Sequence, residues 1–186
     1  MPAVAQAPDA ELIPRAQNGD MDAFEQLVGR YSDLAFRSAY LILGSAADAE
    51  DACQDALYKA YRALPRFRVE LPFRPWLLRI VVNEARNRRR GRSRRGELAL
   101  EEEGDAHPEP GAGPEDAAIA ADSRARLLAL VNGLDANDRD VVTCRFFLEL
   151  SLDETAAALG VPVGTAKSRA HRALARLREL MGDADG

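Results

Sequence analysis

A cluster of basic and hydroxyl side chains near the C-terminus has the residue types and the spacing needed to read DNA. At helical spacing the following residues share one face: Thr165, Ser168, Arg169, Arg172 and Arg176. An arginine in the major groove can form two hydrogen bonds to guanine, which gives about 1–3 kcal/mol of discrimination between bases. Lys167, Arg176 and Arg178 are suited to phosphate oxygens, which position a helix without reading sequence. For His171, a surface position, a phosphate contact and a base contact are equally compatible.

The residues around this face predict a helix-turn-helix. Ser151-Leu152-Asp153-Glu154 has the pattern of a capping box, which satisfies backbone N–H groups at a helix start. Gly160 can end that helix in a left-handed conformation, and Val161-Pro162 directs the chain into another helix. The predicted core stripe of the second helix consists of Val163, Ala166, Ala170, Leu174 and Leu177. A helix-turn-helix places its second helix in the major groove, and ordinary solvated arginines are the alternative.

Charge is distributed unevenly along the chain. The formal net charge is -5, which taken alone argues against a nucleic-acid binder. From Arg79 to Arg95, however, there are eight arginines and one glutamate, whereas residues 97–122 contain nine acids and no Lys or Arg. The arginines from residue 86 to residue 95 are therefore expected to neutralise phosphates, an interaction that weakens steeply with salt.

Helical periodicity also organises the first hundred residues. One apolar stripe predicts a single helix, and its members are Phe24, Leu27, Val28, Tyr31, Leu34, Ala35, Ala39 and Ile42. Ser45 and Asp48 resemble a capping pair that opens a second helix, which Pro65 ends. Residues 66–74 have no consistent period and are predicted to form a loop. Pro75 suits the first turn of a third helix, from Trp76 to about Arg90.

These patterns predict an all-α fold with two small helical domains joined by a flexible acidic linker. No stretch shows sustained strand alternation. Residues 104–114 combine glycine and proline with acids, a composition that cannot bury enough apolar surface to offset its ordering entropy. We expect an N-terminal tail over 1–18, one domain over 19–95, the linker over 96–121 and a second domain over 122–182.

Several classes of protein are disfavoured by composition. Cys53 and Cys144 lack the spacing of a zinc site or a redox motif, so we expect no metal and a reducing cytoplasm. The N-terminus does not resemble a secretory signal, and no apolar run approaches the roughly 18 residues needed to cross a bilayer. The chain has two histidines and no glycine-rich phosphate loop, so we expect neither catalytic residues nor a cofactor.

The segment Glu149–Ala156 followed by Leu159–Arg169 resembles the fourth sigma region of extracytoplasmic-function sigma factors. The N-terminal half resembles the same family independently, through Asp22-Ala23-Phe24, Asp48–Ala52 and Phe73–Ile80 with Asn83 and Asn87. This resemblance implies a protein that binds core RNA polymerase, recognises minus-35 and minus-10 promoter elements and promotes promoter opening.

The resemblance also implies roles for individual residues. Contacts to the minus-35 element are expected from Thr165, Lys167, Ser168, Arg169, His171, Arg172 and Arg176. Recognition and melting of the minus-10 element are expected from Phe67, Arg68, Asn83, Arg86, Asn87 and Arg90. Phe67 is equally compatible with a core position, and Val69-Glu70-Leu71 departs from the small polar residues frequent in this loop of the family. Docking on the clamp helices of the largest polymerase subunit is expected from Glu50, Asp51, Gln54 and Asp55.

Further partners implied by the family are the polymerase flap and an anti-sigma factor. The linker would thread toward the RNA exit channel, or would act as a simple tether between two DNA-reading domains. A helix-turn-helix regulator that acts without polymerase is the main alternative, because it explains the C-terminal motif. It leaves the acidic second helix and the arginine-rich third helix unexplained.

Overall fold

The computed structural model describes residues 7–95, 126–127, 129–131 and 133–184. Within these ranges the regular elements are helices and no strand occurs, which confirms the all-α fold. The predicted linker over 96–121 lies outside the described residues, as do residues 1–6 of the predicted tail.

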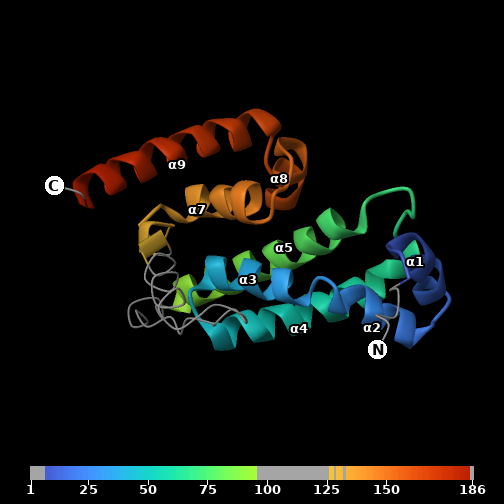
Figure 1. The fold of residues 1–186 in the computed structure, drawn as a ribbon. Coiled ribbons are helices and arrows are strands. Elements are labelled where there is room, and N and C mark those ends of the chain that lie inside the picture. Colours follow the sequence, from blue (N-terminus) through green and yellow to red (C-terminus); the bar gives the residue numbers. More distant parts are fainter. Residues whose placement is uncertain (1–6, 96–125, 128, 132, 185–186) are drawn as a thin grey trace, which may run out of the picture.

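The first group of helices, residues 7–95, is called the N-terminal unit below. It comprises α1 (Asp9–Gln17), α2 (Met21–Gly29), α3 (Ser32–Leu43), α4 (Ala46–Ala63), the short 3-10 helix η1 (Leu64–Arg66) and α5 (Phe73–Arg95). The described residues from 126 onward form the C-terminal unit, with α7 (Ala136–Val142), the π-helical turn η3 (Thr143–Phe147), α8 (Leu152–Leu159) and α9 (Val163–Ala184). Figure 1 shows α4 on one side of α3 and α5, with α7, α8 and α9 on the other side.

The single helix predicted from the first apolar stripe is wrong, because the chain breaks between α2 and α3. Tyr31 precedes α3 with φ -113° and ψ 1°, outside the helical region. The break lets Arg30 pair with Asp9 on α1 at 2.7 Å and lets the Tyr31 hydroxyl donate to the same carboxylate. Burial and the neighbouring Asp9 raise the pKa of Tyr31 to about 12. The stripe continues across the break, but Phe24 and Leu27 of α2 pack in one buried cluster with α1, whereas Ala35, Ala39 and Ile42 of α3 pack in another with α4 and α5.

Residues assigned to a tail in the sequence form α1, and Leu12 and Ile13 on this helix are buried against α2 and α5 residues such as Leu27 and Leu77. The apolar pattern of α1 is too short to show a clear period, which is why the sequence did not reveal it.

Local start and stop signals are confirmed. The Ser45 hydroxyl accepts from the backbone N–H of Asp48 at 3.3 Å and begins α4, and Gly44 ends α3 with φ 74°. Ser151 and Glu154 form the capping box of α8, and Gly160 ends that helix with φ 65°. The third predicted helix begins earlier and ends later than expected, since α5 runs from Phe73 to Arg95. The arginine-rich segment therefore lies on a helix of about 35 Å, at 1.5 Å per residue.

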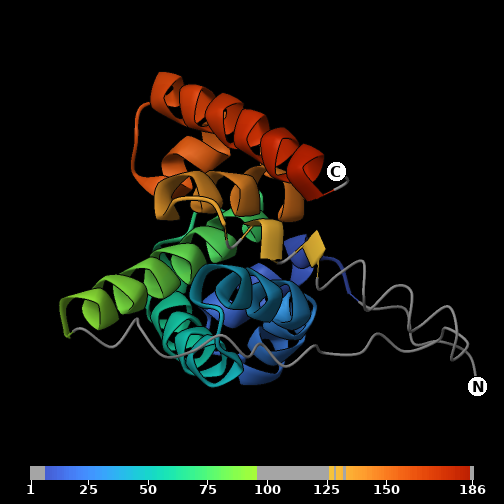
Figure 2. The same cartoon turned by 90° about the vertical axis from the view of Figure 1, so that its left-hand side faces the viewer.

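The two units pack against each other through one continuous hydrophobic core. This core combines residues of α3 and α5, including Ile42, Leu78 and Val82, with Val141, Leu148 and Leu159 of the C-terminal unit. α8 packs on α5, and α7 and η3 contact α3. Figure 2 shows the C-terminal unit seated on the N-terminal unit, with α9 in the outermost layer. The predicted domains are thus joined by buried surface as well as by the chain.

Candidate nucleic-acid interface

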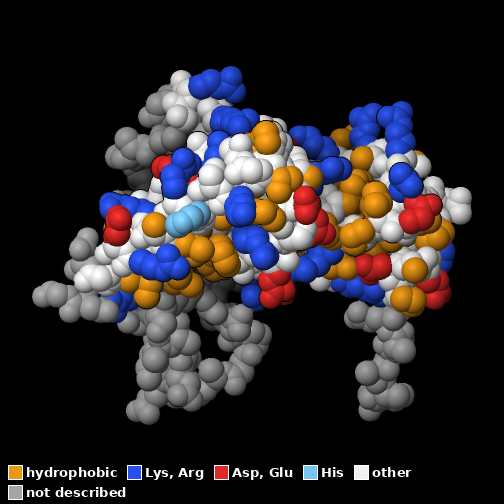
Figure 3. All heavy atoms as spheres, turned by 90° about the horizontal axis from the view of Figure 1, so that it is seen from above, with side chains coloured by type: hydrophobic (Ala, Val, Ile, Leu, Met, Phe, Trp, Pro, Cys, Tyr) orange, Lys and Arg blue, Asp and Glu red, His pale blue; other side chains and the backbone are white. Residues whose placement is uncertain are grey.

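The outer face of α9 carries the residues predicted to read the minus-35 element. Lys167, Ser168, His171, Arg172 and Arg176 are exposed, and Thr165 and Arg169 are half-buried. Figure 3 views the molecule from the α9 side and shows Lys and Arg side chains spread over this face with few acids between them. The helix therefore presents a basic face to solvent.

The inward face of α9 differs in part from the predicted core stripe. Val163 is 41% exposed, whereas Ala166 and Ala173 are buried and Ala170 and Leu177 are partly buried. Val163 is the first residue of α9, so it has no preceding helical turn to pack beside it. The buried stripe thus begins at Ala166 and includes Ala173, a position that the sequence pattern left out.

One arginine on α9 is held in place from a neighbouring helix. Arg172 Nη2 donates to Asp138 Oδ1 of α7 at 3.3 Å, and the Asp138 side chain is only 9% exposed. Arg176 pairs with Glu179 on its own helix at 3.0 Å. Asp138 therefore restricts the Arg172 guanidinium, a contact across 34 residues that helical periodicity cannot reveal.

A second polar face lies on α5. Asn83, Asn87 and Arg90, all predicted to act at the minus-10 element, are exposed. They line up at helical spacing with Arg79 and Arg94, which are also exposed. Near the end of the helix Asn87 and Arg90 line a shallow hollow together with Ser93 and Arg94. The face offers amide groups for base edges and guanidinium groups for phosphates.

Phe67 occupies the core position that was one of its two predicted roles. It is 6% exposed and packs against Phe73 and Trp76, with ring centroids 5.8 Å and 4.8 Å away. Gln17 Nε2 holds the adjacent backbone by donating to the carbonyl of Phe67 at 2.8 Å. Arg68 beside it is exposed and lies 3.5 Å from Glu70. In this arrangement Phe67 offers no surface on which a base can stack, whereas Arg68 points to solvent.

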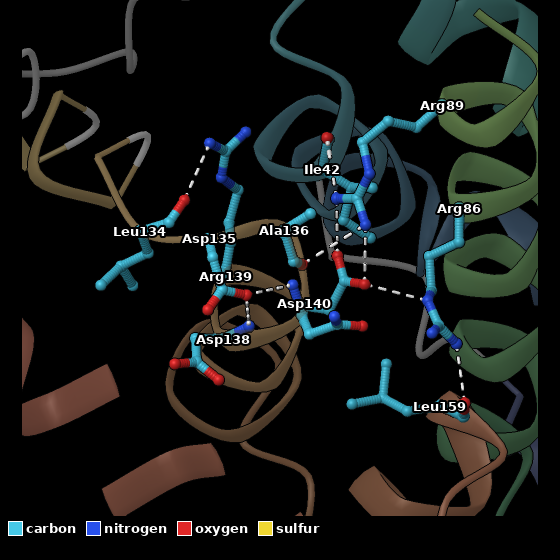
Figure 4. Close-up of polar contacts among 11 residues, drawn as sticks. Ile42, Arg86, Arg89, Leu134, Asp135, Ala136, Asp138, Arg139, Asp140 and Leu159 are labelled. Atoms are coloured by element: carbon cyan, nitrogen blue, oxygen red, sulfur yellow. Dashed lines mark hydrogen bonds and ion pairs between the residues drawn. The ribbon is translucent and has the colours of Figure 1, made fainter. Parts of the chain in front are cut away.

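Arg86 also departs from its predicted place on the DNA-facing surface. It is 6% exposed, its Nε lies 2.9 Å from Asp140 Oδ2 of α7, and its Nη1 donates to the carbonyl of Leu159 at 2.7 Å. Figure 4 shows Arg86 and Arg89 reaching from α5 toward the same Asp140 carboxylate. The burial of Arg86 follows from the packing of the two units, which sequence spacing does not predict.

Arg89 completes this contact between the units. Its two terminal nitrogens donate to the two oxygens of Asp140, both at 2.8 Å, and Asp140 is 1% exposed. Arg89 also donates to the carbonyls of Ala136 at 3.3 Å and Ile42 at 3.5 Å. At the other end of the junction Arg74 Nη2 donates to the carbonyl of Leu148 at 2.7 Å. Charged hydrogen bonds of this kind are the strong ones.

The predicted docking face lies on α4. Glu50, Asp51, Gln54 and Asp55 are all exposed. Asp51 and Asp55 accept hydrogen bonds from Arg88 of α5 at 2.9 Å and 3.0 Å. Burial lowers the pKa of Arg88, but these two carboxylates raise it by more, so the net direction is upward. The acidic face is therefore partly neutralised by the arginine-rich helix.

Sequence patterns missed an aromatic extension of this face. Tyr58 is 62% exposed and Tyr61 is 39% exposed, one and two turns beyond Asp55. The Arg62 guanidinium lies 5.8 Å from the centre of the Tyr58 ring. Two exposed tyrosines close to one another on a single helix are a feature of protein-binding surfaces, in which tyrosine is enriched.

The two cysteines differ in how far they are buried. Cys144 is buried, and burial raises the pKa of its thiol to about 12. Cys53 is half-buried, and burial raises its thiol pKa to about 11. Among the residues that the structure describes, no group of three His, Cys, Asp or Glu side chains is placed to hold a metal ion. None of the described helices is both long enough and apolar enough to span a membrane.

Comparison with known proteins identifies both units. Residues 27–95 match the family model of sigma-70 region 2, and residues 130–179 match that of sigma-70 region 4. Similar curated proteins include the RNA polymerase sigma-H factor of Pseudomonas aeruginosa, 34% identical over 91% of this chain and 92% of that protein. The ECF RNA polymerase sigma-E factor of Escherichia coli is 36% identical over 90% of this chain and 91% of its own length.

Two solved structures are similar across both units. CnrH in complex with the cytosolic domain of CnrY has a TM-score of 0.68 and 31% identity, covering 96% of this chain and 99% of that one. The sigma factor RpoE of Bartonella quintana, in complex with the anti-sigma factor NepR, has a TM-score of 0.70 and 26% identity, covering 86% of this chain and 96% of that one.

The fold, the helix-turn-helix and these matches define a transcription initiation factor rather than an enzyme. More specifically, the chain belongs to the extracytoplasmic-function group of the sigma-70 family.

Proposed function

We propose that this sigma factor docks on core RNA polymerase through α4, recognises the minus-10 element with α5 and the loop before it, and reads the minus-35 element with α9. The observation that carries this proposal is the capped α8, the left-handed turn at Gly160 and the exposed basic face of α9. The relatives named above as RNA polymerase sigma factors support it.

For the minus-35 element, α9 combines two kinds of contact. Arg172 is 65% exposed at its side chain and is anchored by Asp138, so less side-chain entropy is lost when it meets a base. Lys167 and Arg176 are exposed and suited to phosphates. We assign base reading to Arg172 with Ser168 and Arg169, and positioning on the backbone to the two flanking basic residues.

For the minus-10 element, the exposed face of α5 is the candidate surface. Extruding a base from the stack costs a few kcal/mol, which hydrogen bonds to its edge can offset. Asn83 and Asn87 supply amide donors and acceptors one turn apart, and Arg90 supplies a charge for phosphate. Phe67 is a structural member of the aromatic cluster in this assignment, and Arg68 is the exposed side chain of the loop.

For polymerase docking, the acidic face of α4 and its tyrosines form a mixed polar and aromatic surface. Two of its carboxylates, Asp51 and Asp55, are held by Arg88, which limits their side-chain motion before binding. Because CnrH and RpoE are each seen with a bound protein, CnrY and the anti-sigma factor NepR, we also propose an anti-sigma factor as a partner of this chain. Its place of action is then the cytoplasm.

Reversing the charge at Asp51 and Asp55 is expected to weaken binding to core polymerase at least tenfold. The double variant Asp51→Lys with Asp55→Lys removes two exposed carboxylates and places lysines beside Arg88. Titration of labelled protein with core polymerase measures the change. The matched control is Glu25→Lys with Asp33→Lys, which alters the same charge at exposed positions of α2 and α3. Equal affinities for the two double variants would remove the docking assignment.

The proposed function is tested by run-off transcription with core polymerase and a library of promoters. We expect specific transcripts when this protein is added, and strong promoter binding in a gel shift only when polymerase is present. A helix-turn-helix regulator would instead bind its site equally well alone. Equally strong promoter binding with and without polymerase, together with an absence of transcripts, would reject the proposed function.

A further inference from the structure

Arg86 and Arg89 form a site with the geometry of an anion receptor. They lie one turn apart on α5 and share one buried carboxylate: Arg89 donates two hydrogen bonds of 2.8 Å to Asp140, and Arg86 Nε forms an ion pair with it at 2.9 Å (Figure 4). Arginine binds carboxylate and phosphate oxygens in the same forked geometry. The Asp140 carboxylate therefore occupies a position that also suits a phosphate oxygen of DNA.

The neighbouring arginines of α5 behave differently. Arg88 and Arg92 pair with Asp51, Asp55 and Asp48 of α4, which belong to the same unit. Arg86 and Arg89 instead take Asp140 and the carbonyls of Leu159 and Ala136 from the C-terminal unit, and only the contact of Arg89 with Ile42 is internal. Separation of the units would thus leave Arg88 and Arg92 paired and uncover Arg86 and Arg89.

The proposed promoter contacts require such a separation. Elements named minus-35 and minus-10 lie about 25 base pairs apart, which is about 85 Å at 3.4 Å per base pair. In the structure α8 packs on α5 and α9 packs on α7 and α8. Packed helix axes lie about 8–10 Å apart, which places α9 roughly 20 Å from α5. Residues 96–125 have a fully extended length of about 100 Å, so the covalent chain permits the wider spacing.

We propose that Arg86 and Arg89 are a phosphate-binding site for promoter DNA, and that Asp140 fills this site while the two units are packed together. DNA and the C-terminal unit then compete for the same two guanidinium groups. Asp140 is an internal competitor that lowers the affinity of the free protein for promoters. This inference rests on the proposed sigma function. It adds one residue, Asp140, that lowers promoter binding by the free protein.

The test removes the competitor without removing the arginines. Asp140→Asn leaves two buried guanidinium groups without their counter-charge, which favours separation of the units. We expect the affinity of the free, full-length protein for a labelled promoter duplex to rise about tenfold, and its radius of gyration in X-ray scattering to increase. Asp153→Asn is the matched control, because it removes one exposed carboxylate from the same unit and touches neither arginine. This control should change neither quantity by more than twofold.

A second variant removes the two arginines instead of the carboxylate. Arg86→Gln with Arg89→Gln also deprives Asp140 of its partners, so the radius of gyration should increase, but DNA affinity should not rise because the phosphate site is gone. Promoter affinity of Asp140→Asn equal to that of Asp153→Asn would overturn the inference. If Asp140→Asn loses helix content by circular dichroism, the arginine double variant decides, and a compact double variant overturns the inference.

Run-off transcription with the wild-type protein separates this inference from the proposed function. Absence of transcripts with core polymerase rejects the proposed function itself. Normal transcripts combined with an Asp140→Asn variant that binds DNA no better than wild type reject the competition alone.

Discussion

Replacing Arg172 by alanine is expected to reduce transcription by about 5- to 150-fold at promoters whose minus-35 element it reads. A well-formed arginine contact to a base discriminates by about 1–3 kcal/mol, which corresponds to that range. The loss should depend on the base at one position of the element and should vanish on templates that lack the element. The measurement is run-off transcription from promoters that vary at each position of the minus-35 element.

Arg176→Ala provides the comparison for this prediction. It removes the same charge about one turn further along the exposed face of α9, at a position assigned to phosphate. The loss of transcription in Arg176→Ala should be uniform across promoter sequences. The slope of log binding constant against log salt concentration should become smaller by about 1, as expected for one lost phosphate contact. If Arg172→Ala lowers all promoters by the same factor as Arg176→Ala, Arg172 does not read bases. Unfolding curves must accompany both variants, since Arg172 partners Asp138.

Leu78→Ala is expected to lower the free energy of unfolding by about 2–5 kcal/mol. Deleting a buried leucine side chain removes its transfer free energy and leaves a cavity in the core. Leu78 is 0% exposed and belongs to the cluster that contains residues of both units. Because this cluster is shared, the substitution should also weaken the packing of one unit on the other, and urea unfolding followed by circular dichroism measures the loss of stability.

Leu71→Ala is the matched control for the core variant. Leu71 is 50% exposed in the loop before α5, so the same substitution should change stability by no more than about 0.5 kcal/mol. Equal effects at Leu71 and Leu78 would contradict the shared core.

Local signals in the sequence predicted much of this fold. The capping box at Ser151, the cap at Ser45 and the glycine at position 160 each depend on residues within a few positions, and all three are confirmed. The periodicity of apolar side chains was less informative about where helices begin and end. A continuous apolar stripe cannot distinguish one helix from two consecutive helices whose apolar sides are both buried, even in different clusters, which is why the break at Tyr31 was missed.

The candidate sites were harder to predict, because the number of charged residues in a segment does not show which partner each charged side chain binds. The arginines of α5 resemble a uniform phosphate-binding run, yet Arg86 and Arg89 bind Asp140, and Arg88 binds carboxylates of α4. These pairs join residues 33 to 54 positions apart in sequence. Periodicity predicts which face a residue occupies on its own helix, and contributes nothing about which distant carboxylate lies opposite.

Cys144 gives the junction between the units a reporter that needs no engineering. Its thiol lies in the shared core, is fully buried, and has a pKa raised to about 12 by burial. A thiol in that state reacts with alkylating reagents when water reaches it and it can ionise. The rate at which Cys144 is labelled therefore reports how often the junction between the units opens. Cys53 on α4 is partly exposed in the packed state and supplies an internal reference within the same molecule.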